Sequence, residues 1–128
     1  MDVARWATHQ GAEVRFAWGP VELAALGGDH VVVVDVLRFT TAVDAAVGCG
    51  ATVFPYRWKD QTAAAFAASV DATLAGSDPD GPSLSPVRLL STSAGERIVL
   101  PSPNGSTCAV VAAEARAAVR AAGGRDAT

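Results

Sequence analysis

A run of four valines at residues 31–34 constrains the fold of this chain more than any other feature. A β-branched apolar run without alternation is typical of a strand buried on both faces, as in a parallel sheet covered by helices. The run leads directly into Asp35 and Arg38, and then into Thr40 and Thr41. The sequence therefore predicts a buried strand that ends in charged and hydroxyl side chains.

The rest of the chain alternates between strand and helix patterns. Strands are expected at residues 13–20, 30–36, 51–58 and 97–100. Helices are expected at residues 21–28, 42–50, 59–76 and 106–122, the last of them rich in alanine and followed by Gly123 and Gly124. Residues 87–91 fit a short helix or a strand. This alternation predicts a single α/β domain over residues 1–128, with a largely parallel sheet and right-handed crossovers.

Composition narrows the classes of partner. The chain has 128 residues, a formal net charge of −3 and 18% charged residues, so it lacks the basic surface typical of nucleic-acid binding. We expect a small-molecule or protein partner. Cys49 and Cys108 are too few for a disulfide framework. Since no apolar run is long enough to span a membrane and no signal segment opens the chain, we expect a cytoplasmic protein.

The end of the valine strand has the features of an anion site. Ligands of open α/β sheets bind beyond the carboxyl ends of the strands, which is where Asp35 and Arg38 fall. Thr40 and Thr41 follow at the start of a helix, whose unpaired amides and dipole favour negative charge. Arg38 adds a fork that suits phosphate or carboxylate. The alternative is that Asp35 pairs with Arg38, and that Thr41 only caps a helix in a capping box with Asp44.

A second strand-to-helix junction repeats this arrangement. After the strand at 97–100, the turn at Asn104 and Gly105 leads to Ser106 and Thr107 at the start of a helix. Taken alone, this is also an ordinary turn and helix cap. Two such junctions at one edge of a parallel sheet together favour a site for a polyanion.

None of the well-known phosphate-binding sequence motifs occurs in this chain. The chain has no G-x-x-x-x-G-K-[ST] and no G-x-G-x-x-G between a strand and a helix. The haloacid dehalogenase pattern, D-x-D-x-T after an apolar strand, comes nearest. Leu37 stands where that pattern needs its second aspartate, and leucine cannot act as a general acid.

Four segments together resemble the 2-phosphosulfolactate phosphatase family. They are WGP at 18–20, VVDVLRFTTAV at 33–43, GPSLSP at 81–86 and LPSPNGST at 100–107, in the family's order and spacing. The resemblance implies a layered α/β/α fold and a magnesium-dependent phosphatase that hydrolyses a small anionic phosphomonoester such as 2-phospho-3-sulfolactate, in coenzyme M biosynthesis. Because family members are longer, it also implies the N-terminal half of a phosphatase, with a sheet incomplete at its C-terminus.

The resemblance also implies a set of site residues. Asp35 and Arg38 become the catalytic candidates, with Asp35 as the protein ligand of Mg²⁺ and Asp44 as a weaker assistant. The candidates for substrate and phosphate binding are Thr40, Thr41, Ser85, Asn104, Gly105, Ser106 and Thr107. A substrate with phosphate, sulfonate and carboxylate groups needs a cation and amide donors as well as Arg38.

One departure from the family and several alternatives remain. The family's loop commonly has Gly-Asn-Ser-Pro where this chain has Ser-Leu-Ser-Pro at 83–86, so its substrate is open. The chain could instead be a non-catalytic α/β domain that binds an anionic metabolite, or an inactive fragment that needs a partner chain. A homo-oligomer is compatible with the sequence, and neither nucleic acid nor membrane is expected as a partner.

Overall fold

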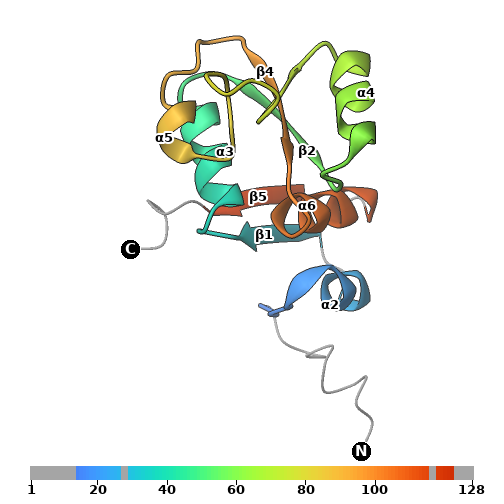
Figure 1. The fold of residues 1–128 in the computed structure, drawn as a ribbon. Helices are drawn as coiled ribbons and strands as arrows, with labels where there is room; N and C mark the ends of the chain where they lie inside the picture. Colours follow the sequence, from blue (N-terminus) through green and yellow to red (C-terminus); the bar gives the residue numbers. More distant parts are fainter. Residues whose placement is uncertain (1–13, 27–28, 116–117, 123–128) are drawn as a thin grey trace, which may run out of the picture.

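The computed structural model describes residues 14–26, 29–115 and 118–122 (Figure 1). The elements in chain order are α2 Gly19–Leu26, β1 His30–Val34, α3 Phe39–Gly48, β2 Thr52–Tyr56, α4 Gln61–Ser69, β3 Thr73–Leu74, α5 Pro86–Leu89, β4 Arg97–Pro101, α6 Gly105–Glu114 and β5 Ala118–Ala122. This alternation gives the layered α/β fold that the sequence predicts.

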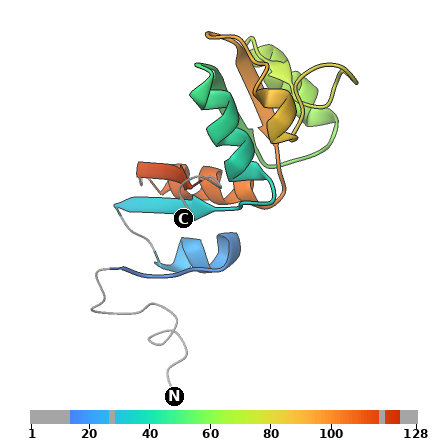
Figure 2. The same ribbon diagram turned by 90° about the vertical axis from the view of Figure 1, so that its left-hand side faces the viewer.

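The five described strands form two sheets, and every pairing within them is parallel. β4 lies between β2 and β3 in one sheet, whereas β1 pairs with β5 in the other. Figures 1 and 2 show α3 and α5 on one face of the three-stranded sheet and α4 on the other face. The strands before the two predicted junctions, β1 and β4, therefore belong to different sheets.

The core centres on β4. Ile98, Val99 and Leu100 have no exposed surface, and Leu89 of α5 and Phe39 of α3 pack into the same region. A central strand with helices on both faces of its sheet buries successive side chains, which explains the uninterrupted apolar run in β4. The remaining volume is filled largely by alanines of the helices.

The prediction that the valine strand is buried on both faces is wrong. Val33 of β1 is buried, but the side chains of Val32 and Val34 are 61% and 64% exposed. β1 lies in the two-stranded sheet, where α6 packs against both β1 and β5. Alternate valines therefore meet solvent, and the strand has the half-buried pattern of a sheet with an open face.

Two of the expected helices end earlier than predicted, and each gives way to a strand. α6 stops at Glu114 and β5 follows, where the sequence predicts one helix; Gly123 and Gly124 lie outside the described residues. α4 stops at Ser69 before β3. Alanine favours helix locally, but parallel pairing with β1 and β4 overrides that preference.

The N-terminal strand prediction is also wrong. Residues 14–18 form neither helix nor strand, and α2 begins at Gly19; Glu13 lies outside the described residues. The carboxylate of Glu22 accepts a hydrogen bond from the amide of Trp18 at 2.7 Å, which supplies a partner at the start of the helix. The unsettled segment at 87–91 contributes to α5. Within the described ranges, no helix has the length and apolar character needed to cross a bilayer.

Candidate functional site

The first junction, between β1 and α3, is closed by its own hydrogen bonds. The amide of Asp35 donates to the Thr40 hydroxyl at 3.0 Å, and the amide of Thr40 donates to the Asp35 carbonyl at 3.0 Å. Thr40 is completely buried, so its hydroxyl fixes the turn. The Asp35 carboxylate is half-buried, and no described residue forms an ion pair or hydrogen bond with it.

The capping box predicted at Thr41 is wrong. α3 begins at Phe39, with Arg38 at the cap position and without a side-chain cap. The Thr41 hydroxyl instead donates to the carbonyl of Val36 at 2.7 Å. The expected alternative, an ion pair between Asp35 and Arg38, is absent among the described residues, where the ion pair present joins Arg57 and Glu114.

The second junction, between β4 and α6, is also fixed by its own hydrogen bonds. The buried hydroxyl of Ser106 donates to the carbonyl of Leu100 at 2.7 Å, and the Gly105 amide donates to the hydroxyl of Ser102 at 3.2 Å. Asn104 is exposed and makes no side-chain cap. Ser106 therefore anchors the helix to the strand, and its hydroxyl is not the ordinary cap that the sequence also allowed.

The two junctions lie against each other although their strands belong to different sheets. A Cβ atom added at Gly105 would lie 2.3 Å from Cδ1 of Phe39, so the first residues of α3 and α6 are in direct contact. Electrostatics agree with this placement. Burial, and after it the negative charge of Asp35, raise the pKa of the Cys108 thiol above its usual value. Asp35 therefore lies close to the first turn of α6.

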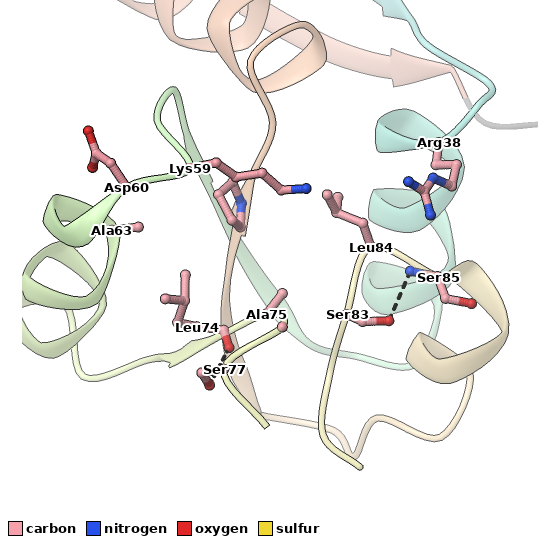
Figure 3. A pocket seen from close by; sticks show the side chains of 12 residues that line it. Arg38, Lys59, Asp60, Ala63, Leu74, Ala75, Ser77, Ser83, Leu84 and Ser85 are labelled. Carbon is pink, nitrogen blue, oxygen red and sulfur yellow. Dashed lines mark hydrogen bonds between the residues drawn. The ribbon is translucent and has the colours of Figure 1, made fainter. Parts of the chain in front are cut away.

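A cleft of about 450 Å³ opens at the carboxyl ends of β2, β3 and β4 (Figure 3). Its polar lining comes from four separate segments, which contribute Arg38, Lys59, Asp60, Ser77, Ser83 and Ser85. Its apolar lining includes Leu74 and Leu84. This is the edge at which parallel α/β sheets bind ligands, and the volume is in the range of small-molecule sites, roughly 300–1,000 Å³.

The structure divides the predicted site between these two places. Arg38 and Ser85 line the cleft, and both lie on its right-hand side in Figure 3. Asp35 does not line the cleft and lies with the start of α6. The other predicted binding residues that are absent from the cleft lining are Thr40, Thr41, Asn104, Gly105, Ser106 and Thr107.

Four polar residues of the cleft lining were not predicted from the sequence, namely Lys59, Asp60, Ser77 and Ser83, and Lys59 is the cation among them. Lys59 lies between β2 and α4, in a strand-to-helix junction that falls between the two predicted ones in the chain. Asp60 follows it as the N-cap of α4 and accepts a hydrogen bond from the amide of Thr62 at 2.9 Å. A charged residue between an apolar strand and a helix is the signal already used for Arg38 at the first junction, and it could have identified Lys59.

In the part of the chain that the structure describes, no group of three histidine, cysteine or acidic side chains could hold a metal ion. Mg²⁺ commonly takes one or two protein carboxylates and keeps water and substrate oxygens as its other ligands. The unpaired, half-buried carboxylate of Asp35 fits that habit.

The fold and the cleft define a parallel α/β domain with a cleft, lined in part by Arg38 and Lys59, at the carboxyl ends of its strands. The chain matches no model of a known protein family, no curated protein and no solved structure. The resemblance to the 2-phosphosulfolactate phosphatase family, based on four sequence segments, stays a prediction.

Proposed function

We propose that this chain binds a small phosphomonoester in the cleft and hydrolyses it with Mg²⁺. The observation that supports this most is the convergence of Arg38, Lys59 and Ser85 on one cavity at the carboxyl edge of a parallel sheet. Two cations and a hydroxyl, supplied by three separate segments, form a donor set suited to a phosphate group. The sulfolactate phosphate of the resembling family remains one candidate substrate.

In this proposal Arg38 and Ser85 hold the phosphate. The guanidinium of Arg38 is exposed and is not part of an ion pair with any described residue, so its donors remain available. Ser85 lies at the end of the long loop, where its amide donates to the hydroxyl of Ser83 at 3.1 Å and fixes its backbone. The guanidinium supplies charge and the hydroxyl supplies a directional donor, both from one side of the cleft.

Asp35 has a separate role in the proposal. Its carboxylate would be the protein ligand of Mg²⁺, which when bound neutralises charge on the phosphoryl oxygens. The amide of the partly exposed Thr107 in the first turn of α6 makes no hydrogen bond to any other described residue. It adds a donor near Asp35, which favours the approach of an anionic group to this carboxylate.

A second candidate function is binding without turnover. Asp35 is absent from the lining of the cleft, and the described residues contain no cluster of metal ligands. An α/β domain that holds an anionic metabolite in the cleft needs Arg38 and Lys59 but not Asp35. Metal dependence and the effect of Asp35 therefore discriminate between the two functions.

The test is release of inorganic phosphate from a panel of small phosphomonoesters, 2-phospho-3-sulfolactate included, with Mg²⁺ and then with excess chelator. We expect turnover that the chelator stops and that Asp35→Asn abolishes. The matched control is Asp71→Asn, which removes the same charge at an exposed position after α4. Absence of turnover in a folded chain that still binds the esters would support the binding function.

Binding is measured on its own with inorganic phosphate. Arg38→Ala should weaken phosphate binding by about 1.5–3 kcal/mol, the scale of a lost charge-assisted hydrogen bond. Circular dichroism and the melting temperature report whether the variant remains folded. An unchanged phosphate affinity in Arg38→Ala would show that Arg38 does not bind the phosphate.

A further inference from the structure

Tyr56, the last residue of β2, joins three elements at the carboxyl edge of the sheet. Its carbonyl accepts a hydrogen bond at 3.0 Å from the amide of Ser102, just after β4. Its ring stacks on Phe66 of α4, with 4.6 Å between the ring centroids and 17° between the planes. Its hydroxyl donates to the hydroxyl of Thr62, in the first turn of α4, at 2.7 Å. Tyr56 therefore links the ends of β2 and β4 to the start of α4.

The hydrogen bonds continue from Thr62 to Asp60, the N-cap of α4. The hydroxyl of Thr62 donates to the Asp60 carboxylate, and the amide of Thr62 donates to the same oxygen at 2.9 Å. Because the Thr62 hydroxyl gives its only proton to Asp60, its lone pairs are available to accept from Tyr56. The three side chains thus form one chain of hydrogen bonds that runs from β2 to the helix cap and fixes where α4 begins.

Lys59 directly precedes this cap and is exposed. No described residue forms a hydrogen bond or an ion pair with it, so its position depends on the backbone that Asp60 fixes. In Figure 3 the Lys59 side chain is directed toward the cleft, whereas that of Asp60 points away from it. The bonds to Thr62 therefore also keep the Asp60 carboxylate from neutralising the neighbouring ammonium.

We propose that Tyr56 is a positioning residue whose hydroxyl, acting through Thr62 and Asp60, holds Lys59 toward the cleft. This inference rests on the proposed function, in which Lys59 is one of the two cations of the phosphate donor set. Tyr56 does not line the cleft and makes no contact with the ligand. Its ring stabilises α4 by stacking, and its hydroxyl fixes the cap, so the two contributions are separable by removing the oxygen alone.

The experiment measures the affinity for inorganic phosphate by calorimetry, in a double-mutant cycle of Tyr56→Phe and Lys59→Met. Tyr56→Phe keeps the ring on Phe66 and removes only the hydroxyl. Thr62→Val interrupts the chain of hydrogen bonds at its middle residue, and Thr62→Ser retains the hydroxyl. The control is Ser69→Ala, which removes a hydroxyl from the last residue of α4, where it donates to the carbonyl of Phe66 at 2.7 Å. Melting temperatures establish that all variants are folded.

We expect Lys59→Met to weaken phosphate binding about fivefold to tenfold, the scale of a partly solvated charge pair. Tyr56→Phe and Thr62→Val should each weaken it about twofold to fivefold, the scale of one solvated hydrogen bond. Thr62→Ser and Ser69→Ala should leave it unchanged. In the Lys59→Met background, Tyr56→Phe should have no further effect, because the group that it positions is gone.

An unchanged phosphate affinity in Tyr56→Phe overturns the inference, and so does an equal loss from Tyr56→Phe with and without Lys59. An unchanged affinity in Lys59→Met also overturns it. In each of these cases the proposed function stands, since the unmodified chain still binds phosphate. If the folded, unmodified chain does not bind phosphate, the proposed function fails and the inference fails with it.

Discussion

At the residue scale, Gly105 decides how closely the two junctions approach. Its missing side chain lets the start of α6 contact Phe39, whose Cβ and Cγ atoms would both lie 2.6 Å from an added Cβ. Both residues are buried, so there is no solvent space into which the extra atom could move. From the sequence, Gly105 was a candidate for close approach to a ligand, but its close neighbour in the structure is the aromatic side chain of Phe39.

Gly105→Ala should therefore lower the free energy of unfolding by about 1–3 kcal/mol, the usual cost of overpacking a core. Urea unfolding measures this change. Asn104→Ala is the adjacent control, because Asn104 is exposed and its side chain makes no cap hydrogen bond. Equal stability of the two variants would contradict the close packing of α3 and α6.

The thiol of Cys108 reports on the position of Asp35. Burial and the charge of Asp35 raise its pKa, so less thiolate is present at a given pH and alkylation is slow. Asp35→Asn removes one of the two causes, and the pKa of Cys108 should fall. In a Cys49→Ser background, the rate of alkylation at pH 8 should then increase. If Asp35→Asn leaves the pH dependence of the Cys108 alkylation rate unchanged, Asp35 does not lie close to α6.

At the element scale, β1 and β4 show how similar apolar runs reach different environments. β4 is central and is buried from Ile98 to Pro101, whereas β1 belongs to a two-stranded sheet and exposes alternate valines. The sequence of β1 alone favours the environment of β4, because four valines contain no polar residue to mark the solvent face. The partner strand and the covering helix make that distinction.

The same isosteric substitution tests the two faces of β1. Val33→Thr places a hydroxyl in a buried position and should cost about 1–3 kcal/mol of unfolding free energy. Val32→Thr keeps the β-branched shape at an exposed position and should change stability by less than about 0.5 kcal/mol. Denaturant unfolding of both variants is the measurement. Equal losses would mean that both faces of β1 are buried.

At the scale of the whole molecule, the two sheets differ in how much apolar surface they bury. The three-stranded sheet contains the completely buried residues of β4 and is covered by helices on both faces. The sheet of β1 and β5 has only two strands and exposes Val32 and Val34. Local stability follows buried apolar contact, so the two sheets should not open together.

Native-state hydrogen exchange measures this difference. The amides of Ile98, Val99 and Leu100 should exchange slowest, at a rate set by global unfolding. The amides of β1 should exchange faster, through local opening of its pairing with β5. Equal protection of β1 and β4 would indicate one cooperative unit that includes both sheets.

Sequence periodicity and turn chemistry were enough to predict the parallel α/β class and, to within one residue, the end of β4. Arg38, chosen for its place after a strand, and Ser85, chosen from the family resemblance, both line the cleft. These features depend on local patterns, because an apolar run or a helix start is encoded by neighbouring residues. The pairing of β1 with β5, the early end of α6, the contact of Gly105 with Phe39 and the position of Lys59 in the cleft were decided only by tertiary structure. Each of them joins segments far apart in the chain, where packing and strand pairing outweigh the local preference of any one segment.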